Sequence, residues 1–110
     1  LDAEPINPGH TLVIPKQPYK NMYEIPESEF THVMQTVHKL TPKIKDAVSA
    51  KGINIGINNE PAAGQEVMHL HVHIMPRFED DNFQHWQGQD NYHDDKRGEQ
   101  IVSSIRKKLT

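Results

Sequence analysis

Three histidines alternate with apolar residues in the middle of the chain, in the segment His69-Leu70-His71-Val72-His73-Ile74-Met75. On an extended strand, this period of two turns the three imidazoles to one face and the apolar side chains to the other. Imidazole is the side chain best suited to attack, or to relay protons, near neutral pH. The segment therefore predicts a row of reactive nitrogens with a hydrophobic backing.

The middle histidine, His71, is the natural nucleophile of this row, because it has one imidazole on each side. A neutral His71 could displace a leaving group from a phosphate ester or amide and form a phospho-histidine that water then hydrolyses. The preceding turn fits this chemistry, since Asn58 and the Gly64-Gln65 pair could offer amide groups to phosphate oxygens. Attack on phosphorus by this route needs no metal and no other cofactor.

A metal site is the alternative interpretation of the same row. Neighbouring imidazoles on a strand lie about 6.6 Å apart and the outer pair about 13 Å apart, whereas zinc–nitrogen bonds are about 2 Å long. Two neighbours could share an ion, but a straight strand could hardly bring all three to it. The chain has no cysteine, so the remaining ligands would come from histidines such as His10, His85 or His93. We therefore favour nucleophilic catalysis without a metal.

The hydrophobic pattern predicts an α+β domain around the row. The predicted elements are a strand at 12–14, a long helix from about residue 26, strands at 53–57 and 67–75, and a short amphipathic helix at 96–109. Gly52 is the predicted stop of the long helix, and Pro42 is predicted to bend it. The strands on either side of the turn at 58–64 should form an antiparallel hairpin.

Composition limits the chain to one compact domain and argues against several kinds of partner. The 110 residues, with 35% apolar content, can bury one core. Twelve basic and fifteen acidic residues give a formal charge of −3, which is not the basic footprint of a nucleic-acid-binding protein. No apolar run approaches membrane-spanning length and no signal peptide is visible. We expect a cytoplasmic protein with no membrane or nucleic-acid partner.

The segments around the row resemble the histidine-triad (HIT) family, whose signature is His-φ-His-φ-His-φ-φ with φ an apolar residue. Residues 69–75 satisfy this signature fully. Residues 7–16 look like the family's Gly-His-x-Leu-Val-Ile-Pro-Lys strand, and residues 58–67 look like its turn before the triad. The resemblance covers nearly the whole chain in order and is closest to the Hint-like and bacterial branch.

This resemblance implies a nucleotide-binding hydrolase that cleaves a nucleoside 5′-phosphoramidate or a dinucleoside polyphosphate at the α-phosphate. In the family, the middle histidine forms a covalent nucleotidyl intermediate, which implies that role for His71. The third histidine, here His73, contacts the phosphate, and the first, here His69, supports the group. His10, from the Gly-His strand, is implied to lie beside them. The implied ligand is a purine nucleotide or another nucleoside phosphate derivative.

The resemblance also implies a set of nucleotide-binding positions, which are Asp2, Asn58, Gly64, Gln65 and Glu66. Asp2 stands eight residues before the Gly-His histidine, where the family has an Asp or Asn that holds the ribose hydroxyls. Glu66 departs from the pattern, because the family often has Ser or Thr there to assist the leaving group. A carboxylate near phosphate is repulsive unless it is protonated, points away or acts as an acid.

The implied fold is a single HIT-like domain over residues 1–110 that forms a homodimer. It has an antiparallel sheet, one long helix packed on the sheet and a short C-terminal helix. The family usually carries a helix and a hairpin before the Gly-His strand, and we expect that stretch to be absent. The C-terminal region of Hint-like members can reach the partner's site, so Trp86 is a candidate dimer or substrate contact. The alternative function is a nucleotide-binding module with little turnover, which Glu66 would suit.

Overall fold

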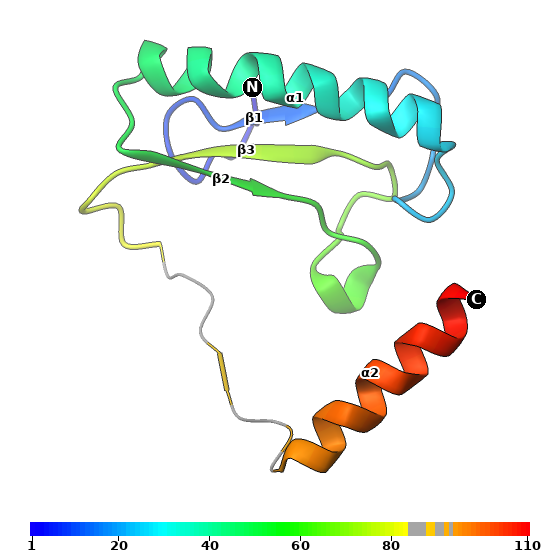
Figure 1. Cartoon of the computed structure of the whole chain (residues 1–110). Helices are drawn as coiled ribbons and strands as arrows, with labels where there is room; N and C mark the ends of the chain where they lie inside the picture. The colour runs from blue at the N-terminus through cyan, green and yellow to red at the C-terminus, as the bar shows by residue number, and fades with distance from the viewer. Residues whose placement is uncertain (84–87, 90–91, 93) are drawn as a thin grey trace.

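The computed structural model describes residues 1–83, 88–89, 92 and 94–110, and its elements follow the predicted order (Figure 1). In chain order they are β1 (Thr11–Val13), α1 (Glu27–Ala47), β2 (Gly52–Gly56), the 3-10 helix η1 (Pro61–Ala63), β3 (Val72–Arg77) and α2 (Asp95–Leu109). The predicted α+β class, with an antiparallel sheet, one long helix and a short C-terminal helix, is confirmed. Within the described residues, no helix is both long and apolar enough to cross a membrane.

β3 is the central strand of a three-stranded antiparallel sheet in the order β1-β3-β2. His73 pairs with Leu12 of β1 on one side and with Gly56 of β2 on the other. The strand predicted at 67–75 is instead formed at Val72–Arg77 and includes Pro76. It begins at Val72 because β1 reaches no further than Val13, the partner of Val72. Pro76 lies beyond the last pair with β1, in a place where a strand tolerates a proline.

The apolar side of the histidine row forms the core of the domain. Leu70, Val72 and Ile74 are fully buried and belong to one cluster with Val33 and Val37 of α1. Helix α1 lies along the sheet (Figure 1) and presents its apolar stripe to it. The face of the row that carries no imidazole is therefore closed by the longest helix.

Helix α1 is a single helix that contains Pro42 in its interior. A proline removes one backbone donor and is predicted to bend a helix. In Figure 1 the ribbon nevertheless runs on without a break. Pro42 is exposed, and the hydroxyl of the preceding Thr41 donates to the Val37 carbonyl at 2.7 Å.

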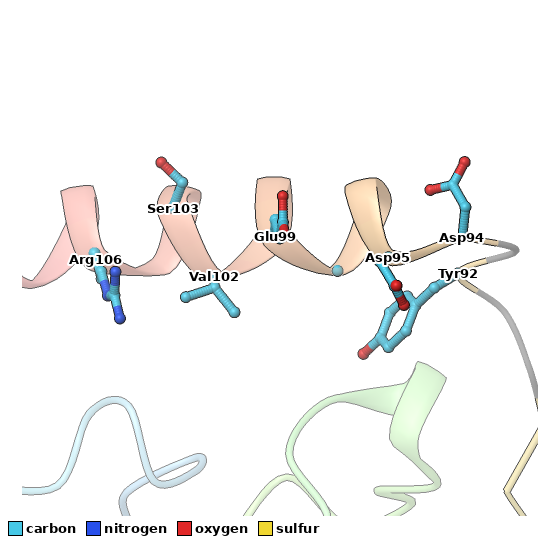
Figure 2. Close-up of a pocket in the computed structure, with 8 residues that line it drawn as sticks. Tyr92, Asp94, Asp95, Glu99, Val102, Ser103 and Arg106 are labelled. Carbon is cyan, nitrogen blue, oxygen red and sulfur yellow. The ribbon is translucent and has the colours of Figure 1, made fainter.

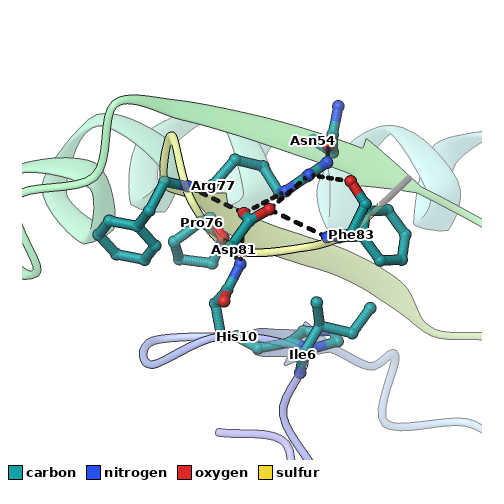
Figure 3. Close-up of polar contacts among 9 residues, drawn as sticks. Ile6, His10, Asn54, Pro76, Arg77, Asp81 and Phe83 are labelled. Atoms are coloured by element: carbon teal, nitrogen blue, oxygen red, sulfur yellow. Dashed lines mark hydrogen bonds and ion pairs between the residues drawn. The ribbon is translucent and has the colours of Figure 1, made fainter. Parts of the chain in front are cut away.

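A buried ion pair holds the segment that follows β3 (Figure 3). Arg77 Nε and Nη2 donate to the two carboxylate oxygens of Asp81 at 2.8 and 2.9 Å. The same guanidinium donates to Asn54 Oδ1 at 2.7 Å and to the Phe83 carbonyl at 2.9 Å. A bidentate guanidinium–carboxylate pair with further hydrogen bonds is the favourable form of a buried ion pair. It fastens the end of β3 to its neighbour β2.

Asn7 extends this network to the segment before β1. Its side-chain amide donates to the Pro76 carbonyl at 2.8 Å and to Asp81 Oδ2 at 2.9 Å. The Asn7 carbonyl in turn accepts from the His10 amide at 3.1 Å. The network therefore helps to hold His10 beside the sheet.

We expect Asp81→Asn to lower the melting temperature by about 5 °C or more, because it leaves the Arg77 guanidinium without its charged partner. Thermal unfolding followed by circular dichroism measures this change. The neighbouring Asp80 is exposed, so Asp80→Asn is the matched control and should change the melting temperature by about a degree at most. Equal effects of the two substitutions would contradict a structural role for the pair.

The same pair should give stability a specific dependence on pH. Hydrogen bonds from Arg77, and then from the Phe78 amide, hold the pKa of Asp81 well below its usual range. The unfolded chain therefore takes up a proton at this carboxyl first, near pH 4. The contribution of Asp81 is fully present above that pH and declines as the pH falls below it. The difference in melting temperature between wild type and Asp81→Asn should accordingly shrink in acid.

Candidate active site

His71 is half-buried, and its Nδ1 lies 2.7 Å from the backbone carbonyl oxygen of His69. A carbonyl oxygen only accepts hydrogen bonds, so Nδ1 is the donor and carries the proton. In the neutral ring, the lone pair then resides on Nε2, which has no hydrogen-bond partner among the described residues. The backbone thus selects the tautomer that a nucleophile requires.

His69 forms hydrogen bonds through both its ring and its backbone carbonyl. Its Nε2 lies 3.2 Å from the Pro15 carbonyl, so this nitrogen is also a donor. Pro15 is buried just after β1, which ties the start of the row to the neighbouring strand. His69 therefore positions His71 through its own carbonyl group while its ring is engaged elsewhere.

His10 and His73 form a short chain of hydrogen bonds that begins at the backbone. The Ile6 amide donates to His10 Nδ1 at 3.1 Å, and Figure 3 shows Ile6 beside that ring. The proton of a neutral His10 is then on Nε2, which lies 2.9 Å from His73 Nδ1. If His10 donates, the proton of His73 is on its Nε2. His73 therefore presents a donor, whereas His71 presents a lone pair.

The three imidazoles of His10, His71 and His73 lie in contact. The ring centroids of His71 and His73 are 4.8 Å apart, and those of His10 and His73 are 5.1 Å apart. Burial lowers the pKa of His10, and the nearby Asp2 carboxylate opposes this in part. Burial also lowers the pKa of His73, and charge on His71 and His10 lowers it further. These directions favour neutral rings at pH 7, as the hydrogen-bond chain requires.

Asp2 lies against the same imidazoles. Its Oδ2 is 3.5 Å from His10 Nε2, and its amide donates to the His10 carbonyl at 2.8 Å. A hydrogen bond from the Glu4 amide to Oδ1 is the main cause that lowers the pKa of Asp2. An ionised carboxylate at this place can accept hydrogen bonds from two hydroxyl groups of a ligand.

Asp2, His10 and His73 could also hold a metal ion, because each offers one ligand atom and these atoms lie within 4.8 Å of one another. This set differs from the straight row of three histidines, since only His73 belongs to that row. Two histidines considered as further ligands, His85 and His93, lie outside the described residues. Trp86, the candidate dimer or substrate contact, lies outside them as well.

The turn before the row holds Asn58 and Gly64 together. Asn58 Nδ2 donates to the Gly64 carbonyl at 3.4 Å. Gly64 has φ +92°, a left-handed conformation that favours glycine, and it ends η1. Glu66 is exposed and forms no hydrogen bond or ion pair within the described part of the chain. The roles of these three residues toward a nucleotide stay predictions.

Gln65 is buried between two loops. Its Oε1 accepts from the Glu60 amide at 2.7 Å, and its Nε2 donates to the Lys20 carbonyl at 2.6 Å. The loop that contains Lys20 also contacts the row, because the Tyr19 carbonyl accepts from the Leu70 amide at 2.8 Å. The side chain of Gln65 thus joins the two loops beside the site. Any direct contact between Gln65 and a ligand stays a prediction.

Two groups that orient the imidazoles were not apparent in the sequence, the Ile6 amide and the Pro15 carbonyl. Both are backbone groups in segments far along the chain from the histidine row. Every residue except proline carries an amide and every residue carries a carbonyl, so no residue type could have marked these two.

The HIT domain family model matches residues 1–80 of the chain. The chain is 35% identical to the adenylylsulfatase HINT3 of Arabidopsis thaliana, covering 99% of this chain and 56% of that protein. It is 42% identical to the asymmetrical bis(5′-nucleosyl)-tetraphosphatase of Schizosaccharomyces pombe, covering 70% and 42% respectively. The chain thus spans less than two thirds of the length of these relatives. The crystal structure of SMU.412c from Streptococcus mutans UA159 shares 36% identity and superposes with a TM-score of 0.93, covering 100% of this chain and 69% of that one.

The protonated ring nitrogens can be observed directly by long-range proton–nitrogen NMR correlation on ¹⁵N-labelled protein. We expect the proton on Nδ1 in His71 and on Nε2 in His10 and His73. The titration midpoints of His10 and His73 should lie below the ordinary value of 6.5, because burial opposes the charged form. The signals of the exposed helix histidines His32 and His38 serve as the reference. A His71 ring protonated only on Nε2 would contradict the assignment.

Proposed function

Because this chain belongs to the HIT family, we propose that it hydrolyses a nucleoside 5′-phosphoramidate or a dinucleoside polyphosphate at the α-phosphate, through a covalent intermediate on His71. The hydrogen bond from His71 Nδ1 to the His69 carbonyl is the observation that carries this proposal. It leaves Nε2 of a half-buried ring without a hydrogen-bond partner among the described residues, and an Nε2 lone pair of this kind can attack phosphorus.

In the first step, the Nε2 lone pair of His71 forms a bond to the α-phosphorus. The bond from phosphorus to the leaving group breaks, and the leaving group departs with the electron pair; a polyphosphate leaves as the anion, whereas an amine takes up a proton from the solvent. In the second step, water attacks the same phosphorus and the phosphorus–nitrogen bond breaks. A nucleoside monophosphate leaves, the proton of the attacking water is released, and His71 returns to its neutral form.

The imidazole of His73 can assist these two reaction steps. His73 has its Nε2 proton available for a non-bridging phosphate oxygen, because its Nδ1 accepts from His10. An anionic phosphate also favours protonation of a nearby imidazole, which would strengthen this donor. A fixed donor close to the developing charge stabilises the transition state without reorganisation.

We assign the ribose hydroxyls to Asp2 and the phosphate to the turn that contains Asn58, Gly64, Gln65 and Glu66. The position of Asp2 supports the first assignment. Its Oδ2 lies 3.5 Å from His10 Nε2, and its lowered pKa favours the ionised carboxylate. The names of the relatives support the substrate class, since they describe an adenylylsulfatase and a bis(5′-nucleosyl)-tetraphosphatase. A purine base, a homodimer and a cytoplasmic location stay predictions.

The test is to trap the intermediate with adenosine 5′-phosphoramidate. The protein is mixed with the substrate for a short time and denatured at neutral or alkaline pH, because a phosphorus–nitrogen bond is labile in acid. Intact-mass spectrometry should then show one added adenylyl group. His71→Ala should abolish this adduct and lower kcat by at least about a thousandfold, since it removes the nucleophile.

His32→Ala is the matched control, because His32 is an exposed histidine on α1. It should keep both the adduct and the turnover. Turnover that survives in His71→Ala would refute the nucleophile. A wild-type protein that binds the nucleotide but yields neither adduct nor product would instead favour the binding module with little turnover.

A further inference from the structure

One carboxylate of the described residues lies against the imidazoles of the candidate active site, and it belongs to Asp2. Its Oδ2 is 3.5 Å from Nε2 of His10, and no other carboxylate of the described residues forms an ion pair with a histidine. The acidic side chains of Asp94, Asp95 and Glu99 line a groove along α2 instead (Figure 2). Within the described chain, that helix contacts neither the three strands nor α1.

Backbone groups orient the Asp2 carboxylate. The Asp2 amide donates to the His10 carbonyl at 2.8 Å, which joins the two residues. The Glu4 amide donates to Oδ1 of Asp2 at 3.0 Å, so Oδ2 is the oxygen that remains for His10. The His10 ring is buried, whereas the Asp2 side chain is 21% exposed. The carboxylate therefore contacts a buried imidazole and is still accessible to a ligand.

The nitrogen of His10 that faces Asp2 is also the nitrogen that contacts His73. His10 Nε2 lies 2.9 Å from His73 Nδ1, so a proton on this Nε2 has an acceptor on both sides. If the proton moved to Nδ1, the lone pair on Nε2 would face the negative carboxylate, which is unfavourable. Nδ1 would also lose the hydrogen bond that it accepts from the Ile6 amide at 3.1 Å. The carboxylate at one ring nitrogen and the amide at the other thus favour the same tautomer.

The tautomer of His10 decides what His73 can offer to a phosphate. When His10 donates, Nδ1 of His73 accepts and its Nε2 carries the proton. In the opposite arrangement, His73 would donate to His10 and would present a lone pair to the phosphate, which repels anionic oxygens. The ability of His73 to donate therefore depends on how the proton of His10 is held.

We propose that Asp2 is a positioning residue, whose carboxylate keeps the proton of His10 on Nε2 and thereby keeps the Nε2–H of His73 available to the phosphate. A carboxylate that holds an imidazole in one tautomer is an established catalytic device. This role is additional to the ribose hydroxyls that we assign to Asp2, because it acts through His10 and needs no hydroxyl group. A carboxylate has about four lone-pair sites and can serve both. The proposal rests on the proposed function, since it concerns the donor to the α-phosphate.

Asp2→Asn tests the tautomer, because the two side chains have the same shape. The Glu4 amide requires an acceptor, so the carboxamide oxygen should take the place of Oδ1 and its NH2 group the place of Oδ2. This NH2 group and the Nε2–H of His10 are both donors and would face each other. Long-range proton–nitrogen NMR correlation on ligand-free protein should then show a population of His10 and His73 with the proton on Nδ1. Tautomers identical to those of the wild type would overturn the proposal.

The titration midpoints separate this role from a purely structural one. Burial is the main cause that lowers the pKa of His10 and of His73, and the Asp2 carboxylate raises both. The other titratable neighbour of the pair, His71, is unchanged in the variant. Loss of the carboxylate should therefore lower both midpoints. A loosened segment would instead admit water to the rings and raise the midpoints towards 6.5, which would refute a positioning role.

Asp95→Asn is the matched control for these measurements. It makes the same change at an exposed carboxylate of α2 (Figure 2). Because this helix contacts neither the strands nor α1 within the described chain, the tautomers and the midpoints of His10 and His73 should stay as in the wild type.

A substrate without ribose hydroxyls separates the two roles of Asp2 in turnover. With 2′,3′-dideoxyadenosine 5′-phosphoramidate, Asp2→Asn should still lower kcat at least about tenfold, because the charge that supports the donor is lost. An effect confined to the KM of adenosine 5′-phosphoramidate would mean that Asp2 acts on the ribose alone, contrary to the proposal. A wild type that turns over neither substrate would refute the proposed function, and the NMR measurements would still decide the role of Asp2.

Discussion

Leu70, Val72 and Ile74 decide where the imidazoles lie, because the side chains of an extended segment alternate between its two faces. All three are fully buried under α1, so the histidines between them are directed to the other face. A shift of one residue in register would bury imidazoles and expose the apolar side chains, which the core strongly disfavours. The packing of the core and the orientation of the site are therefore one and the same constraint.

Backbone groups then determine which ring nitrogen of each histidine carries the proton. The His69 carbonyl holds the proton of His71 on Nδ1, the Pro15 carbonyl accepts from His69, and the Ile6 amide directs the proton of His10 towards His73. Backbone amides and carbonyls do not titrate near neutral pH, and the fold fixes their positions. A site arranged in this way has its donors and its lone pair in place before a ligand arrives, which reduces the reorganisation that catalysis requires.

The remaining parts of the chain have separable tasks. The network of Arg77, Asp81 and Asn7 fastens the end of β3 to β2 and to the segment that leads to His10. Within the described residues, α2 contacts neither β1, β2, β3 nor α1, so the imidazoles are held in place without it.

Local periodicity in the sequence was enough to predict the α+β class, the order of the elements, the long helix and the face on which the three histidines lie. Periodicity records which side chains are buried, and burial is what makes a helix or a strand fold. It does not record which distant backbone groups come together. The tautomers of His71 and His73, the burial of Gln65 between two loops and the start of β3 at Val72 all depend on segments far apart in the chain. Only the tertiary structure decided these, and only it showed that no residue of α2 is buried by the described part of the chain.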